Sequence, residues 1–328
     1  MADDARAGGT TRRTLLAAAP VVGAAAALGL PESLHRGLAP GMRLAHARAS
    51  DTLTIGDIRV RVVSDGTVAL PVAFTLPETG AADFDALFRE NGEEPPREFI
   101  NQTNVVLIET GDRRILVDAG AGPTFQATAG RLTDALLDID VAPESVTDVV
   151  FTHGHADHLW GAVDDFEEGP RFVGARHVMG EAEHAFWTDP STPETAPDWL
   201  VGLALGAARV IGTLGDSLET ARADAELAPG VSYVATPGHT PGHMSVLVES
   251  GGAQLLIGGD ALTNALISFQ KPDWPLGTDL DRERAIATRL ALLDRLATDR
   301  IGLVGFHLPF PGIGSVERRD GAFIFASG

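Results

Sequence analysis

One short stretch, residues 153–158, constrains this chain more than any other. It reads His-Gly-His-Ala-Asp-His, so four side chains able to bind a metal ion fall within six residues. The apolar run 149–151 precedes it and predicts a buried strand that ends where the loop begins. Imidazole and carboxylate together suit zinc and similar divalent ions, and alternate residues of an extended loop can face two neighbouring ions. The spacing therefore predicts a metal centre. The alternative, four solvated polar residues on a turn, would not require this specific spacing.

Length and composition fit one large α/β domain or two small ones. The chain has 328 residues, 44% of them hydrophobic, which is enough for a substantial core. It has no cysteine, so any metal must be held by His, Asp or Glu. Residues 1–49 hold six Arg against three acidic residues, so a formal net charge of -20 leaves -23 on the remainder. A body this acidic is a poor partner for nucleic acid or an anionic membrane surface.

The first 49 residues differ from everything that follows. Arg12 and Arg13 precede an Ala-rich apolar stretch that reaches Leu30, and Ala47 and Ala49 then offer a cleavage site. This segment resembles a twin-arginine secretion signal, which predicts export to the periplasm or the medium without stable membrane insertion after processing. The alternative is a membrane anchor or a buried N-terminal helix, but the apolar run is short and interrupted by proline and glycine. We therefore expect a signal over 1–49 and one folded domain over 50–328.

Strand and helix patterns alternate along that domain. Runs of β-branched residues predict a hairpin over 52–55 and 58–64 near the mature N-terminus. Proline, glycine and acidic residues over 71–102 predict a long surface excursion that holds one short helix, 83–89. Further helices are expected over 124–137, in broken segments over 181–211, and over 281–297, where Ile286, Leu290, Leu293 and Leu296 share one face.

Two parts of the chain repeat one pattern. Residues 106–111, followed by Asp118, have a counterpart in residues 246–251, followed by Asp260. Likewise Thr-His-Gly-His at 152–155 has an echo in Thr-Pro-Gly-His at 236–239. These echoes predict a duplicated β-rich unit, with two facing sheets and helices outside them.

Three more metal-ligand candidates follow strand-like runs, where a rigid sheet can hold a side chain in place. They are His239, Asp260 and His307. We expect His243 to support the ligands from behind and His184 to lie at the surface. The resulting seven candidates could build two sites with one carboxylate between them: His153, His155, Asp157, His158, His239, Asp260 and His307.

The pattern His-x-His-x-Asp-His, followed by single His, Asp and His candidates and preceded by Asp118 at a strand end, resembles the metallo-β-lactamase superfamily over residues 51–328. The resemblance implies an αββα sandwich of two facing mixed sheets that holds two divalent ions, zinc above all. It further implies a role for each candidate. His153, His155 and His239 would bind one ion, Asp157, His158 and His307 the other, while Asp260 bridges them and Asp118 orients the loop.

Two other segments are similar to methyl parathion hydrolase and related exported lactonases. They read Ser-Asp-Gly-Thr-Val-Ala-Leu-Pro-Val at 64–72 and His-Leu-Pro-Phe-Pro-Gly-Ile-Gly at 307–314. Thr75, however, stands where the phosphotriesterase has a basic residue, and Gly154 and Ala156 depart from its metal cluster. The resemblance places four residues at or near the wall of the substrate pocket: Leu70, Phe125, Trp187 and Trp199.

Together these features predict a metal-dependent hydrolase. Two zinc-like ions that share a water lower its pKa from 15.7 to roughly 7, so no side-chain base is needed, and Asp157 is placed to pass a proton. We expect a small, neutral, apolar substrate, namely a lactone or an aryl ester. Phosphotriesters, thioesters and β-lactams are the alternatives within the same fold, and a homodimer is left open.

Three other classes of protein fit the sequence less well. A nuclease of this fold would need a basic substrate face, which the acidic body does not provide. An oxygen-reducing di-iron protein of the superfamily would typically have Glu at the position of His155. A binding module without catalysis would have lost ligands, and none of the seven is missing.

Overall fold

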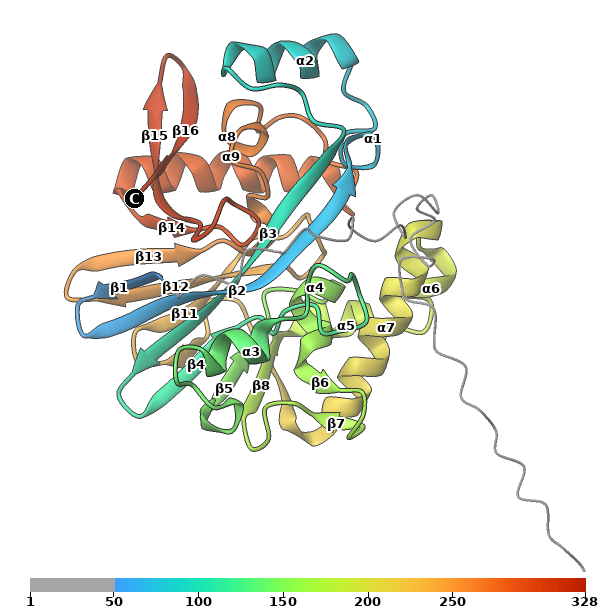
Figure 1. The fold of residues 1–328 in the computed structure, drawn as a ribbon, viewed down its shortest axis with the longest axis vertical. Helices are drawn as coiled ribbons and strands as arrows, with labels where there is room; N and C mark the ends of the chain where they lie inside the picture. Colours follow the sequence, from blue (N-terminus) through green and yellow to red (C-terminus); the bar gives the residue numbers. More distant parts are fainter. Residues whose placement is uncertain (1–50) are drawn as a thin grey trace, which may run out of the picture.

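The computed structural model describes residues 51–328 and contains two seven-stranded β-sheets that face each other (Figure 1). The predicted signal, residues 1–49, lies outside the described residues. The first sheet has the order β1-β2-β3-β4-β5-β8-β9 and the second the order β10 to β16, while β6 and β7 form a separate ribbon. Both large sheets combine parallel and antiparallel pairs, as the predicted αββα sandwich requires.

The strands of the first sheet are β1 (Asp51–Ile55), β2 (Ile58–Pro71), β3 (Glu98–Thr110), β4 (Arg113–Val117), β5 (Asp148–Val150), β8 (Arg176–Gly180) and β9 (Leu218–Ala221). Those of the second are β10 (Glu226–Ala228), β11 (Val231–Ala235), β12 (Met244–Ser250), β13 (Ala253–Ile257), β14 (Gly302–Val304), β15 (Ile313–Arg319) and β16 (Ala322–Ser327). The ribbon is β6 (Val163–Asp164) and β7 (Gly169–Pro170).

The helices are α1 (Val72–Thr75), α2 (Ala81–Glu90), α3 (Leu132–Leu137), α4 (Ala156–Leu159), α5 (Glu181–Thr188), α6 (Thr192–Thr195), α7 (Asp198–Leu214), α8 (Ile267–Gln270) and α9 (Arg282–Asp299). Short 3-10 turns lie at Pro143–Ser145, Trp160–Ala162, Gly215–Ser217 and Gly259–Ala261.

Alternation along the strands sends side chains to two different cores. In β3, Val106 and Ile108 face the second sheet, whereas Val105 and Leu107 face the helices outside the first sheet. Successive strand residues point to opposite faces, so one apolar run fills both layers. Helices α3, α4, α5 and α7 cover the outer face of the first sheet, and α8 and α9 cover that of the second (Figure 1).

The two sheets share one connectivity, as the sequence echoes predicted. In the first, β2, β3 and β4 pair antiparallel and β5 then joins β4 in parallel. In the second, β11, β12 and β13 pair antiparallel and β14 joins β13 in parallel. Asp118 comes directly after β4, and Asp260 lies three residues after the end of β13. Equivalent strands of the two sheets therefore each end near an acidic residue at the same edge of the sandwich.

Three predicted elements differ from the structure. The strand expected to end at residue 64 continues to Pro71, because a bulge between Ser64 and Thr67 lets β2 pair with β3 along its whole length. The excursion expected over 71–102 therefore covers only α1, α2 and their connections. The end of β2 is set by its pairing with β3, and local composition does not reveal that pairing.

The helix expected over 124–137 begins only at Leu132. The buried carboxylate of Asp65 accepts the backbone N–H groups of Ala121, Gly130 and Leu132, and Gly130 has a φ of +80°. These bonds hold residues 121–131 as an irregular loop against the bulge of β2. A side chain from a distant strand thus replaces the helical hydrogen bonds that the apolar spacing predicted.

The predicted face of α9 is rotated. Leu293 and Leu296 are buried, as expected, but Leu290 is 40% exposed and the neighbouring Arg289 is buried at 2%. The guanidinium of Arg289 donates to the carboxylate of Asp279, which explains why a charged side chain takes an inward position.

The stretch Asp198–Ser217, which includes α7, is long and apolar enough to cross a membrane by length and composition alone. Core helices meet the same test, and α7 buries seven residues in the core outside the first sheet. We therefore interpret α7 as a core helix of the sandwich.

Candidate metal centre

All seven predicted ligands lie at one edge of the sandwich, each in a segment that follows a strand. His153, His155, Asp157 and His158 come from the loop after β5 and from α4. The remaining three follow β11, β13 and β14 of the second sheet, namely His239, Asp260 and His307. All seven are buried, at 8% exposure or less. The centre therefore forms only when the two sheets meet.

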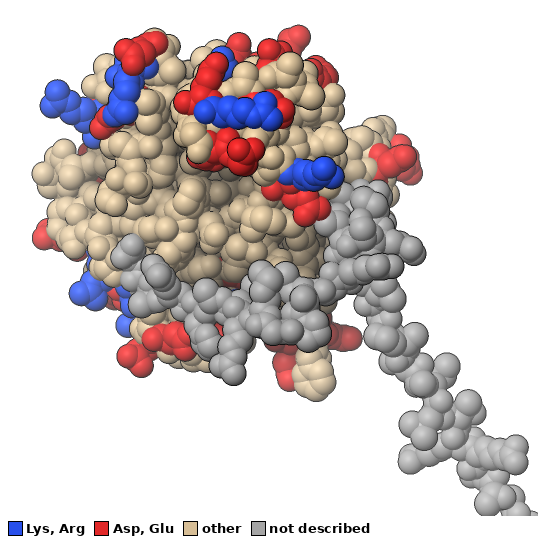
Figure 2. Space-filling view, turned by 45° about the horizontal axis from the view of Figure 1, so that its top comes forward, with Lys and Arg blue, Asp and Glu red and all other residues tan. Residues whose placement is uncertain are grey.

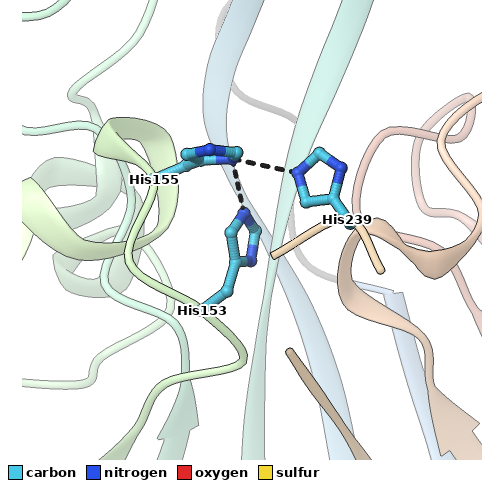
Figure 3. Close-up of side chains that lie close together, drawn as sticks. All are labelled: His153, His155 and His239. Carbon is cyan, nitrogen blue, oxygen red and sulfur yellow. Dashed lines mark hydrogen bonds between the residues drawn. The ribbon is translucent and has the colours of Figure 1, made fainter. Parts of the chain in front are cut away.

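Three histidines form the first grouping, and their rings point toward one another (Figure 3). His155 Nδ1 lies 3.0 Å from His153 Nε2 and 2.9 Å from His239 Nε2. Nitrogens bound to one tetrahedral zinc ion are about 3.3 Å apart, as bonds of about 2.05 Å require. The three nitrogens are therefore placed to face a single small ion.

Asp157, His158 and His307 form a second grouping. His307 Nε2 lies 3.3 Å from Asp157 Oδ2, and His158 Nε2 lies 3.8 Å from the same oxygen. This set offers two imidazoles and one carboxylate, which also suits zinc and related divalent ions.

Asp260 lies between the two groupings. Its Oδ2 is 3.3 Å from His239 Nε2 and 3.2 Å from His307 Nε2, and its Oδ1 is 3.2 Å from His158 Nε2. Within residues 51–328, neither Asp260 Oδ1 nor His158 Nε2 has a hydrogen-bond partner, although both atoms are buried. A cation between them would satisfy both, so the residues present fit two ions with a shared carboxylate.

Electrostatics favours positive charge at this place. Burial alone lowers the pKa of His307, but Asp260 and Asp157 outweigh burial and raise it to about 10. The pKa of His158 is likewise held well above its usual value, against burial, by Asp260, Asp118 and Asp157. By contrast, burial and neighbouring histidines hold the pKa of His153 and His155 well below normal, which keeps them in the neutral form that binds metal.

A family comparison agrees with this geometry. The model of the metallo-beta-lactamase superfamily matches residues 100–304, which is more than half of the 328 residues. The chain belongs to the metallo-β-lactamase superfamily. Six of the seven predicted ligands lie within the matched range, and His307 follows three residues beyond it.

Curated relatives match a part of the chain. The thioesterase pkgB of Emericella nidulans is 29% identical over 184 residues, which cover 56% of this chain and 42% of the relative. The probable metallo-hydrolase Mb2322c of Mycobacterium bovis is 31% identical over 179 residues, which cover 48% and 56% of the two chains. The chain spans about half the length of the curated relatives it matches.

Solved structures match almost the whole described fold. AidC, a dizinc quorum-quenching lactonase, superposes with a TM-score of 0.79 at 23% identity, covering 85% of this chain and 97% of AidC. The hydrolase AbOPH superposes with a TM-score of 0.80 at 23% identity, covering 87% and 99%. At this identity the likeness shows the fold of the superfamily, with its mixed sheets and outer helices.

Asp118, which the resemblance to the superfamily led us to expect as the residue that orients the first metal-binding loop, hydrogen bonds to that loop. Its φ is +66°, which turns the carboxylate back under the loop. Oδ1 accepts the backbone N–H of Thr152 at 2.7 Å, and Oδ2 lies 2.8 Å from His158 Nδ1. The bond fixes the ring so that Nε2 faces the centre.

The predicted support by His243 is also in place. Its Nε2 accepts the backbone N–H of Asp260 at 2.9 Å, and its Nδ1 lies 2.8 Å from Thr236 Oγ1. Burial lowers the pKa of His243 to about 3, so the ring is neutral and can accept this bond. It holds the backbone of the candidate bridging residue.

Sequence reasoning missed the residues that support the second-sheet ligands. His239 Nδ1 lies 3.0 Å from Asp279, whose other oxygen accepts from Arg289, and His307 Nδ1 donates to the carbonyl of Gln102 at 2.7 Å. Asp279 carries no local motif, and a backbone carbonyl leaves no trace in sequence. A charged residue within the apolar face of α9 was the one available signal.

Of the four predicted pocket residues, two lie near the candidate metal centre and two are buried in the core. Leu70 lines a cavity beside Asp260 and His307, and the half-buried Trp199 has its ring 6.3 Å from that of His155. Trp187 is 1% exposed and its indole donates to Glu183, and Phe125 packs edge-on against Trp160 in the core. Neither of these two side chains lines the cavity beside Asp260 and His307, and a contact of either with substrate stays a prediction.

The cavity beside the centre has a neutral wall apart from the candidate ligands. It is lined by Leu70, Thr75, Phe99, Asn101, Asp260, Thr263, Asn264, Ile267, Leu276, Thr278 and His307. A larger hollow of about 500 Å³ lies between α1 and α2, but none of the candidate ligands lines it. We therefore assign the substrate side to the smaller cavity.

Proposed function

We propose that this chain is an exported hydrolase with two divalent metal ions that opens lactones or cleaves aryl esters. One observation carries the proposal: Asp260 lies within 3.3 Å of ligand atoms from both groupings, so a single carboxylate can serve two ions. When bound, such a pair would lower the pKa of a shared water toward neutrality and would polarise the carbonyl oxygen of a substrate. No serine or cysteine nucleophile is required.

The chain's own residues supply the rest of the chemistry. His153, His155 and His239 hold one position, while Asp157, His158 and His307 hold the other. His158 and His307 lower the pKa of Asp157 against the effect of burial, so this carboxylate is ionised and can accept a proton and pass it to the leaving group.

A neutral substrate fits the wall of the cavity. Thr75 and Asn101 line it as uncharged hydrogen-bonding groups, Leu70 and Leu276 supply apolar surface, and no Lys or Arg is among the lining residues. Figure 2 shows the few Lys and Arg side chains of one face lying among acidic ones, without a continuous basic groove. Anionic substrates such as nucleic acids are therefore disfavoured.

A substrate panel tests the proposal. Purified, metal-loaded protein is assayed with lactones, aryl esters, phosphotriesters, thioesters and β-lactams at one pH. We expect the highest kcat/KM for a lactone or an aryl ester. A clear preference for phosphotriesters over every lactone would overturn the assignment. Thioesters are the second candidate, because the relative pkgB is a thioesterase.

Export is tested separately, with the segment 1–49. Replacing Arg12 and Arg13 by Lys should leave a folded, active precursor inside the cell, because the twin-arginine route reads this pair. Secretion at the level of the unchanged protein would show that the segment is an anchor or a signal of another kind.

A further inference from the structure

Glu183, at the start of α5, is a buried carboxylate without a cation. It is fully buried, and among residues 51–328 no Arg, Lys or His forms an ion pair with it. Burying an unpaired charge is costly unless hydrogen bonds compensate for the lost water. The position of Glu183 therefore calls for a reason beyond packing.

Four donors surround the carboxylate and divide between its two oxygens. Oε1 accepts the backbone N–H of Gly154 at 2.9 Å and the indole N–H of Trp187 at 2.5 Å. Oε2 accepts the hydroxyl of Thr240 at 2.7 Å and the backbone N–H of Gly242 at 3.0 Å. Gly154 lies between two candidate ligands of the first sheet, whereas Thr240 and Gly242 follow His239 of the second.

The loop with Gly154 and the loop with Gly242 both pack closely against α5. A Cβ at position 154 would collide with the indole nitrogen of Trp187, and a Cβ at position 242 would collide with the backbone nitrogen of Glu183. The ring of Trp187 also packs edge-on against His155, with centroids 5.6 Å apart. Glycine is needed at both places so that each loop can approach α5 closely.

We propose that Glu183 is a positioning residue that joins the two metal-binding loops, 153–158 and 239–243, through one carboxylate. Each oxygen holds one loop, so the spacing between His153, His155 and His239 is fixed by a group that touches none of them. Glu183 does not touch substrate or metal. This inference rests on the proposed metal-ligand set. It adds a residue that fixes the position of the two metal-binding loops relative to each other.

Glu183→Gln is the direct test, because it keeps the size of the side chain. The amide has one acceptor oxygen, so its NH2 must face the donors of one loop and leave them unpaired. The loop that faces the NH2 should then loosen in the metal-free protein, and the tie between the two loops should be lost. We expect faster amide hydrogen exchange at Gly154 or at Gly242, whichever faces the NH2, and Zn²⁺ affinity about 10- to 100-fold weaker in competition with a chelator. The exposed Glu181→Gln on the same helix is the matched control and should change neither.

Thr240 offers a second pair of variants if Glu183→Gln does not fold. Thr240→Val removes one donor at nearly constant volume, whereas Thr240→Ser keeps the hydroxyl. We expect a several-fold loss of Zn²⁺ affinity for the valine variant and recovery to within about twofold for serine. Equal affinities for the two variants would overturn the proposal, as would unchanged exchange at both loops or unchanged Zn²⁺ binding in Glu183→Gln.

The same measurements separate this inference from the proposed function. Exchange rates and Zn²⁺ binding need no substrate, so an error in the substrate class leaves them unaffected. If the unchanged protein bound no Zn²⁺, the metal mechanism would fall, while exchange at the two loops would still report whether Glu183 joins them.

Discussion

The two sheets contribute to the metal centre in different ways. The first supplies four ligands within six consecutive residues, from one loop and the short helix α4, and Asp118 supports that loop from the neighbouring strand end. The second supplies His239, Asp260 and His307 singly, from three segments up to 68 residues apart. Each of these has its own support from elsewhere in the chain. The ligands of the compact motif therefore share supports, Asp118 below the loop and Glu183 between the two loops, whereas each scattered ligand has a separate supporting group.

Removing Asp260 should have the largest effect, because this carboxylate belongs to both halves. Asp260→Ala removes the carboxylate that we propose to lie between two cations, so both ions should loosen and activity should fall by more than about 100-fold. Metal content after dialysis and kcat on the best substrate give the result. The exposed Asp273→Ala, on the loop that follows α8, is the control. Near-normal turnover of Asp260→Ala would show that the two halves share another group.

Asp118 and Asp279 provide a matched comparison of the two supports. Asp118→Asn should weaken the site that contains His158, and Asp279→Asn the site that contains His239, each by about 10- to 100-fold in metal affinity. Asp279→Asn should also lower the free energy of unfolding by about 3 kcal/mol, because buried Arg289 loses its anion. Chelator titration and denaturant unfolding of the metal-free proteins measure both effects. Equal losses of free energy of unfolding in Asp118→Asn and Asp279→Asn would show that the two supporting carboxylates do not differ in their effect on stability.

Leu70 and Trp187 test which predicted pocket residue meets substrate. Leu70→Ala should reduce kcat/KM for a long-chain lactone more than for a short one, because only a longer substrate reaches the missing contact. The activation free energy for the long-chain substrate should rise by about 1 to 3 kcal/mol. Trp187→Ala should instead lower stability by about 3 to 5 kcal/mol and affect both chain lengths equally. A chain-length effect confined to Trp187→Ala would restore the original interpretation from sequence.

A further effect is expected on the stability of the folded chain in acid. Burial lowers the pKa of His177, in β8, to about 4 from 6.5. Between these values the unfolded chain binds more protons than the folded one, so stability rises with pH through this window and is lost as pH falls. The contribution is up to about 3 kcal/mol. His177→Asn should flatten this dependence in denaturant unfolding at pH 4 to 7. An unchanged slope would assign it to other groups.

Much of the centre could be predicted because its ligands come in local patterns. The cluster at 153–158 and the echoes around Asp118 and Asp260 also predicted two similar sheets. Asp279, Gln102 and Glu183 could not be predicted, because each acts across a fold that brings distant segments together. The same reason explains the missing helix turns before Leu132, where a carboxylate from β2 takes over the backbone donors.

The number of metal ions per chain shows directly whether Asp260 serves two sites. We expect close to two divalent ions per chain in active protein, measured by elemental analysis against protein concentration, since Asp260 can serve both groupings at once. Full activity with one ion or none would contradict the shared carboxylate and the two-metal mechanism that rests on it.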